Sequence, residues 1–418
     1  MALKILHFTP DVEAGSPFAQ HVDMLLYKMS QYADTHLVTL SPLSSGPTTN
    51  IPTYSLDDSE RRRSRKRVTY LPALQRRFLT LLYAIKPDVV HIHGSWNYMC
   101  SRIALWSRKR GFHVVLSPYY SLEVKEEQAD YGMKMWQMIA YQKHMLRHAS
   151  AIQVTDPVSY RILTEKNLNA RTILSEGFDP QSEDSYDQMA TDLMWLYRKL
   201  LDSHVQQHLD VNSEEALSAL LHVGLARETS QQILSPESIL NLRSIKPTSW
   251  RYIDLFAYDH GIMEVLQQGV VRMQLRRPDF HPEEVDRFAP TLQRDTTPLP
   301  SDILLSEDRK MRRRLNALTT RDDAAVRKIC VMVLNIKHHY KKQTLSLRHL
   351  CDLYDVMRHE DYDEDVFYEA ATSLGILSLT RRLCQLLYET AYLEEGFMPV
   401  YRLDDKETEE MRQYLIRY

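Results

Sequence analysis

The sequence predicts an α/β protein with a doubly wound parallel sheet in its first 180 residues and a mostly α-helical remainder. Two observations support this prediction. Short apolar segments alternate with amphipathic helical patterns over the first part, which is typical of a parallel sheet covered by helices. After residue 180 the apolar residues recur at helical spacing instead.

The opening βα unit lies within the first 29 residues. The apolar run Leu3–Phe8 predicts a buried strand, and Ser16 followed by Pro17 is typical of a helix N-cap with proline at the first helical position. Apolar residues at helical spacing then continue to Met29. The further elements predicted in this region are the strands His36–Leu40, Phe112–Leu116, Ala151–Thr155 and Arg171–Leu174 and the helices Tyr98–Arg110 and Gly132–Ala149.

The segment PDVVHIHGSWN at residues 87–97 is the strongest indication of a site, because a buried strand leads directly into imidazoles, a glycine and an indole. His91 and His93 are expected to share one face, since side chains alternate along a strand. Ligands of open α/β sheets bind beyond the carboxyl ends of the strands, and Gly94 allows the sharp turn that such a site needs. The alternative reading is that both histidines are hydrogen-bonded core residues.

Five segments follow one another along the first half: LKILHFTP at 3–10 with Gly15 after it, PDVVHIHGSWN at 87–97, HVVLSPYYSLE at 113–123, LRHASAIQVTD at 146–156 and ILSEGFD at 173–179. In this order they resemble the N-terminal half of family 4 glycosyltransferases, which have the two-domain GT-B architecture. The resemblance covers residues 1–180, less than half of the chain. It implies an acceptor-binding, Rossmann-like domain whose cleft is lined by the loops after Phe8, His93 and Leu116.

The resemblance and the strand-end positions together suggest a set of site residues. His93 is the main candidate for contacting an acceptor hydroxyl, and His91 lies beside it or supports it from the core. Trp96 offers a ring on which a sugar could stack, or packs at the start of a helix. The predicted catalytic residues are His93, His91 and Tyr119, and the predicted acceptor-binding residues are Gly15, Ser16, Gly94, Trp96, Asn97 and Glu123. No metal ligands are predicted.

The sequence departs from the family in three ways, of which the mildest is the change of the family's paired glycines in the opening loop to Gly15 and Ser16. The family's histidine after Ser-Pro is Tyr119 here, and a phenol with a pKa near 10 is a poor base at neutral pH. After Asp179 the chain also lacks the glycine-rich turns and the pair of glutamates at the family's spacing that hold a nucleotide-sugar. The nearest imitation of a donor-domain turn is the segment around Gly224, which continues in helical composition. No cofactor is therefore predicted, and a nucleotide-sugar donor is left unsupported.

The second half contains several amphipathic helical stripes, the first of which follows a cap at Asp184 or Ser185. Five prolines among charged residues at 276–304 indicate a linker or an extended wrapping segment. The predicted division is an acceptor-type Rossmann-like domain at 1–180, a helical region at 181–275, a proline-rich linker at 276–304 and a helical C-terminal domain at 305–418.

Composition indicates a cytoplasmic protein of more than one domain. The 418 residues exceed the size of a typical single core, and the four cysteines show neither disulfide nor zinc spacing. No apolar run reaches the length of a membrane-spanning helix, and the start lacks a secretory signal pattern. A formal net charge of −3 argues against a dedicated nucleic-acid binder.

One basic run stands apart from this near-neutral balance: Arg61, Arg62, Arg63, Arg65, Lys66 and Arg67. Apolar residues at helical spacing follow it, so the segment is either a surface that contacts anionic lipid at the inner face of the membrane or a solvated basic loop. The other partners considered are a glycan or lipid-linked sugar acceptor and a protein bound through the helical half.

The function that follows is a glycosyltransferase-like protein of the family 4 type, in surface polysaccharide or glycoconjugate synthesis, with a degenerate or missing donor domain. If active, it would be a nucleotide-sugar-dependent hexosyltransferase. The alternatives are a non-catalytic scaffold or regulator that keeps an acceptor-like pocket, and one half of a split glycosyltransferase whose donor domain comes from a partner. Donor, acceptor and oligomeric state are not indicated by the sequence.

Overall fold

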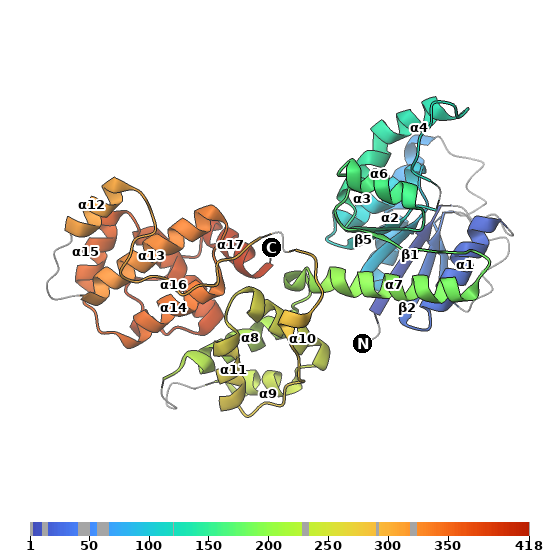
Figure 1. Ribbon diagram of the computed structural model, residues 1–418. Coiled ribbons are helices and arrows are strands. Elements are labelled where there is room, and N and C mark those ends of the chain that lie inside the picture. Colours follow the sequence, from blue (N-terminus) through green and yellow to red (C-terminus); the bar gives the residue numbers. More distant parts are fainter. Residues whose placement is uncertain are drawn as a thin grey trace. The chain divides into compact units, whose positions relative to one another are not determined.

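The computed structural model describes the residues in the ranges 3–10, 16–40, 51–56, 67–119, 121–227, 234–289, 292–317 and 324–417. The chain forms two compact units, residues 1–201 and residues 202–418, and each is described by itself (Figure 1). The predicted boundaries at 180, 275 and 304 stay predictions. In the contacts of the structure, most of the helix that follows residue 180 belongs to the first unit.

The first unit contains a seven-stranded sheet in which all pairs of neighbouring strands are parallel, with the order β3-β2-β1-β4-β5-β6-β7. The strands are β1 (Leu3–Thr9), β2 (Ala33–Thr39), β3 (Thr53–Ser55), β4 (Val89–His93), β5 (His113–Ser117), β6 (Ala151–Val154) and β7 (Thr172–Leu174). The predicted fold class is confirmed. The short edge strand β3 was not predicted, because three residues carry too little pattern to be recognised.

Helices alternate with these strands, and several begin at caps that the sequence encodes. The hydroxyl of Ser16 accepts a hydrogen bond from the backbone amide of Ala19 (3.1 Å), as the predicted N-cap requires. The helices are α1 (Pro17–Met29), α2 (Arg67–Ile85), α3 (Tyr98–Arg108), α4 (Tyr131–Gln137), the π-helical η1 (Met138–Gln142), α5 (Lys143–His148), α6 (Pro157–Glu165) and α7 (Glu183–Asp202). The single helix predicted over 132–149 is therefore interrupted by a π-turn.

The two faces of the sheet differ in chemistry. Leu6, Val90 and Ile92 point into an apolar core shared with α2, α3, α5 and α6. The opposite face carries polar side chains at the carboxyl ends of the strands, and α7 runs along this side (Figure 1). The phenol of Tyr197 on α7 reaches His91. Because successive strand residues alternate between the two faces, the same strands supply both the apolar core and the polar cluster.

The described regular elements of the second unit are all helical, as predicted. They are η2 (Val205–Gln207), α8 (Val211–Leu225), α9 (Pro236–Ser244), α10 (Pro247–Asp259), α11 (Met263–Arg272), η4 (Pro282–Glu284), α12 (Arg309–Ala317), α13 (Ala324–Lys342), α14 (Leu347–His359), α15 (Glu364–Leu374), α16 (Leu377–Ala391), η5 (Glu395–Phe397), α17 (Lys406–Arg412) and η6 (Gln413–Arg417). One hydrophobic cluster joins them, from Val205 to Leu415. The unit therefore has a single continuous core.

The segment around Gly224, which faintly resembled a donor-domain turn, belongs to α8. Its backbone packs directly on α11: a Cβ atom built on Gly224 would lie 2.1 Å from the carbonyl oxygen of Val265. The glycine is thus needed for close helix packing, and the turn reading of this segment is wrong.

The proline-rich stretch at 276–304 runs over the second unit with one short 3-10 turn in its described part. The Arg287 guanidinium pairs with both oxygens of Asp259, and Arg294 donates to the backbone carbonyls of Leu345 and Tyr414. These contacts hold the stretch against the helices of the second unit, and its reading as a linker or a wrapping segment stays a prediction.

No described helix combines the length and the apolar character that crossing a bilayer requires.

Candidate functional site

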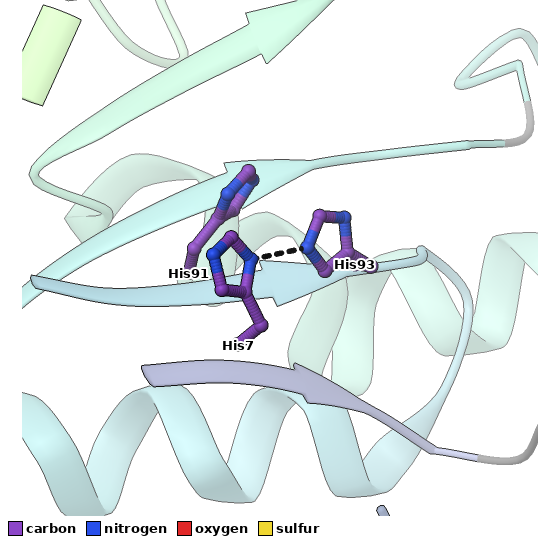
Figure 2. Close-up of side chains that lie close together, drawn as sticks. All are labelled: His7, His91 and His93. Carbon is purple, nitrogen blue, oxygen red and sulfur yellow. Dashed lines mark hydrogen bonds between the residues drawn. The ribbon is translucent and has the colours of Figure 1, made fainter. Parts of the chain in front are cut away.

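The candidate site lies at the carboxyl end of the central strands, where β1 and β4 bring three histidines together. His7 and His91 are register partners, and His93 is two residues further along β4 on the same face. All three side chains are essentially inaccessible to solvent. The rings of His91 and His93 are 4.1 Å apart between centroids, which confirms that the two share a face (Figure 2).

One hydrogen bond joins two of these histidines directly. The Nδ1 atom of His7 lies 2.8 Å from the Nε2 atom of His93, and their rings are stacked. Figure 2 shows this contact, with His91 beside the pair. The Nε2 atom of His7 is buried and has no hydrogen-bond partner among the described residues.

His91 belongs to a second set of hydrogen bonds that crosses the sheet. Its Nδ1 atom lies 2.6 Å from the phenol oxygen of Tyr197 on α7, and its Nε2 atom lies 2.7 Å from the hydroxyl of Ser117 on β5. Ser117 donates to the side-chain carbonyl of Gln153 (2.6 Å), and the Nε2 amide of Gln153 donates to the hydroxyl of Ser175 (3.1 Å). Both nitrogens of His91 are therefore engaged, and the network ties α7 to the sheet.

Burial sets the protonation states of this cluster. It lowers the pKa of His7 to about 3, with a smaller effect from the nearby His36, and it lowers the pKa of His91 and of His93 well below the usual value. Burial also raises the pKa of the Tyr197 phenol well above its usual value. At neutral pH the imidazoles are uncharged and the phenol keeps its proton, so Tyr197 can donate to the Nδ1 atom of His91.

The three histidines could hold a metal ion, because one ligand atom from each lies within 4.8 Å of the others. Coordination by His91 would require it to give up its hydrogen bond to Tyr197 or to Ser117, whereas the Nε2 atom of His7 has no described partner to give up. The prediction of no metal site stays a prediction. The hydrogen bonds of the structure are those of a neutral polar cluster.

A small cavity of about 10 Å³ opens beside this cluster at the carboxyl ends of β4, β5 and β6. It is lined by Phe18, His21, His93, Ser117, Pro118, Tyr119, Gln153, Thr155 and Met189. Of the predicted catalytic residues, His93 and Tyr119 therefore meet here, while His91 lies behind them in the core. A space of this size holds about one water molecule, so a sugar ring does not fit inside it.

Two residues in the turn after β4 have a left-handed backbone conformation. Gly94 has φ +111° and Trp96 has φ +59°, a value that residues other than glycine rarely adopt. The Trp96 indole donates to the backbone carbonyl of Ser121 (3.1 Å), and the Asn97 side chain caps α3 by accepting from the amide of Met99. Trp96 and Asn97 are held in place beyond the carboxyl end of the central strand β4, and they do not line the cavity.

The remaining predicted residues are placed elsewhere or are not described. Ser16 caps α1, and the Glu123 carboxylate pairs with Lys125 at 3.1 Å, so neither lines the cavity. Gly15, Arg61, Arg62, Arg63, Arg65 and Lys66 lie outside the described residues, and Arg67 is described only as the first residue of α2. The roles predicted for all of these residues stay predictions.

Three residues at or beside the site were not predicted from the sequence: His7, His21 and Tyr197. His7 was available from the alternation of LKILHF, which places it on the face opposite Leu6 and Phe8. His21 lies one turn after Phe18 on α1 and packs on Tyr119, with ring centroids 5.0 Å apart. Tyr197 belonged to an apolar helical stripe, and nothing in that pattern indicates that its hydroxyl reaches β4.

One protein-family model matches part of the chain. Residues 29–174 match the family model described as "Glycosyl transferase 4-like domain". The resemblance of the N-terminal part to family 4 glycosyltransferases is thereby confirmed. The glycosyl transferase 4-like domain spans β2 to β7 and includes His91, His93 and Tyr119, whereas His7 on β1 and Tyr197 on α7 lie outside the matched residues.

One solved structure similar to this chain is that of UDP-N-acetylglucosamine 2-epimerase from Rickettsia bellii. The two share 13% sequence identity with a TM-score of 0.33, over 59% of this chain and 66% of the epimerase chain. No curated protein sequence matches the chain.

Proposed function

We propose that this chain is a glycosyltransferase-like protein that binds a sugar acceptor at its first unit and has no nucleotide-sugar donor site of its own. The match to a glycosyl transferase 4-like domain over residues 29–174 supports the first part. We further propose that it acts in surface polysaccharide or glycoconjugate synthesis, which is the setting that the family resemblance suggests.

The observation that carries the proposal is the helical second unit. A GT-B enzyme of the kind that the first half resembles holds its donor in a second parallel sheet with glycine-rich turns. The described part of residues 202–418 contains helices around one core, and Gly224 and Gly269 are used for helix packing. These features favour a protein that lacks a donor site over an active transferase with a divergent one.

A titration of the purified chain with nucleotide-sugars tests this directly. We expect isothermal calorimetry to show no saturable heat with UDP- or GDP-sugars, because the described regular elements of the second unit are helices and include no strand that leads into a glycine-rich turn. Saturable binding of any of these donors would contradict the proposal. A thermal melt of the same sample, with cooperative unfolding, serves as the control for a folded protein.

The proposed binding of a sugar acceptor is argued from the side chains around the small cavity. Burial lowers the pKa of His93 well below its usual value, which makes its neutral imidazole a weak base, so it suits hydrogen bonding to a sugar hydroxyl better than proton abstraction. Tyr119 is half-buried and packs on the rings of Phe18 and His21. Since a sugar ring does not fit inside the cavity, we expect an acceptor to contact the rim at Tyr119.

The variant Tyr119→Phe isolates the contribution of this phenol. It keeps the ring and its packing but removes the hydroxyl, and a lost hydrogen bond of about 1 kcal/mol corresponds to about fivefold weaker binding. The measurement is the affinity for glycans selected from an array by the wild-type protein. Tyr83→Phe, at an exposed tyrosine of α2, is the matched control and should bind like the wild type. Equal binding by Tyr119→Phe and the wild type would place the acceptor elsewhere.

A further inference from the structure

The helix α12 in the second unit carries an unusual concentration of positive charge. Five of its nine residues are cationic and exposed: Arg309, Lys310, Arg312, Arg313 and Arg314. Met311 is half-buried and Leu315 is buried, and the helix packs against α15. At about 3.6 residues per turn, these two apolar residues share the inner face, and the cations cover the outward arc of the helix.

This arrangement is electrostatically unfavourable for the helix itself. Arg309 and Arg313, and likewise Lys310 and Arg314, are four residues apart, and like charges at this spacing repel. Arg309 and Lys310 also lie in the first turn, where the helix dipole disfavours positive charge, and that turn contains no acidic residue. An anionic partner would relieve both effects.

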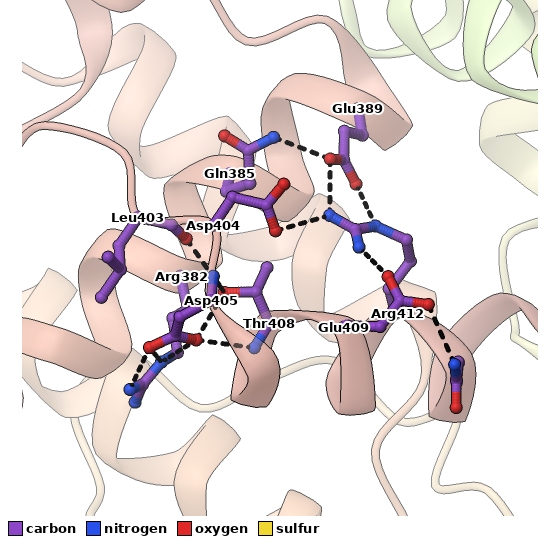
Figure 3. A network of polar contacts seen from close by, with 10 residues as sticks. Arg382, Gln385, Glu389, Leu403, Asp404, Asp405, Thr408, Glu409 and Arg412 are labelled. Carbon is purple, nitrogen blue, oxygen red and sulfur yellow. Dashed lines mark hydrogen bonds and ion pairs between the residues drawn. The ribbon is translucent and has the colours of Figure 1, made fainter.

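Two arginines elsewhere in the second unit form close ion pairs with acidic residues. Figure 3 shows Arg382 paired with Asp405, with a shortest N–O distance of 2.6 Å, and Arg412 paired with Glu389 (2.8 Å) and Asp404 (3.0 Å). The five cations of α12, by contrast, form no ion pair with any residue that the structure describes. Asp308, just before the helix, accepts hydrogen bonds from the backbone amides of Lys310 and Met311.

We propose that α12 docks the second unit onto an anionic phospholipid bilayer. A convex ridge of guanidinium groups suits a flat array of phosphates, which arginine binds in a bidentate manner. Clusters of four to eight basic residues on a helix are typical of surfaces that bind anionic lipid. The exposed arc of α12 carries no large apolar side chain, so the contact stays at the headgroups and is sensitive to salt.

Two observations favour lipid over nucleic acid as the anion. The helix has no aromatic side chain on which a base could stack, and its cations form a ridge, whereas proteins that bind single strands line a groove. The chain as a whole also has a net charge of −3. The ridge is therefore a local basic surface on a slightly acidic protein.

Vesicle co-sedimentation of the full chain tests the proposal. We expect binding to phosphatidylcholine vesicles that contain about 30% phosphatidylglycerol and not to phosphatidylcholine alone, with release as salt rises from about 50 to about 300 mM. The variant with Gln at all five α12 cations should bind at least tenfold more weakly. Hydrogen exchange of the peptide 309–317 should slow on anionic vesicles in the wild type, which reports on α12 whether or not the basic run at 61–67 also binds.

The matched control neutralises five scattered exposed cations, Lys109, Arg110, Arg161, Lys166 and Lys341, and should bind vesicles like the wild type. If both variants lost vesicle binding to the same extent, the total charge of the protein and not α12 would account for binding, and the proposal would be overturned. Unchanged exchange at 309–317 on anionic vesicles would overturn it as well, as would binding of a DNA duplex through α12 with no binding to vesicles. Circular dichroism of both variants verifies that they fold.

Discussion

Acidification from about pH 8 to about pH 5 is expected to lower the free energy of unfolding of the first unit by several kcal/mol. His7, His91 and His93 are buried and uncharged in the folded chain, with the pKa of His7 lowered to about 3 by burial, assisted by His36. Burial also lowers the pKa of His21, to about 4. In the unfolded chain each of these side chains titrates near pH 6.5.

The sign follows from proton uptake. Because the folded pKa values lie below those of the unfolded chain, the unfolded state binds more protons once the pH falls below about 6.5. The stabilisation is fully present above this pH and is lost progressively toward the folded pKa, which is about 3 for His7. At pH 5 each histidine that stays neutral in the fold contributes a loss of about 2 kcal/mol, and coupling between neighbours changes the sum.

Hydrogen exchange of β1 and β4 peptides, corrected for the intrinsic pH dependence of exchange, measures this loss separately from the second unit. His148→Gln, at an exposed histidine of α5 outside the buried cluster, serves as the matched substitution control. His91→Asn is expected to lower stability at pH 8 but to flatten its decline toward pH 5. A free energy of opening that is constant between these pH values would show that the cluster is not the buried, neutral network described above.

Gly269→Ala is expected to destabilise the second unit by about 3 kcal/mol, near the upper end of what overpacking costs. A Cβ atom at this position of α11 would lie 2.3 Å from the carbonyl oxygen of Leu220 on α8, and one at Gly224 would meet Val265 equally closely. In both cases the clash is with backbone, so rotation of a side chain cannot relieve it. The two helices would have to separate, which would also disturb the hydrogen bonds from Arg272 to the end of α8.

Urea unfolding followed by circular dichroism measures the effect, with Gly132→Ala as the matched control. Gly132 is also helical, in α4, but a Cβ atom there would have no neighbour within 4 Å. That substitution should be neutral or stabilising by about 0.5–1 kcal/mol, because alanine loses less conformational entropy in a helix. Equal effects of the two substitutions would contradict the close packing of α8 and α11.

Local pattern predicted most of the first unit because the central strands β4, β5 and β6 are buried on both faces and the helices bury one face. The cap at Ser16, the strand into His93 and the helix from Tyr98 all lie where the sequence indicates, and the helical character of the second half follows from its apolar spacing. The short strand β3 and the π-turn at Met138–Gln142 were missed, since neither departs enough from its surroundings in composition.

The candidate site was predicted only in part, because the alternation of side chains along a strand gives limited information. A period of two shows that His91 and His93 share a face, but it does not show what covers that face. Tyr197 on α7 is 106 residues away from His91 along the chain, and its hydroxyl is hydrogen-bonded to the Nδ1 atom of that imidazole. The proposed catalytic residues are consequently more buried than their position at a strand end suggested.

The sequence by itself predicted most strands and helices of the first unit, apart from β3 and the π-turn, and the helical nature of the described second unit. These depend on the spacing of apolar residues and on caps, which act over a few residues. Only the tertiary structure decided that His7, His91 and His93 meet, that Tyr197 closes their face, that Gly224 and Gly269 bring two helices into contact and that the α12 cations have no described ion-pair partners. Each of these depends on which distant surfaces pack together, and local periodicity holds no information about that choice.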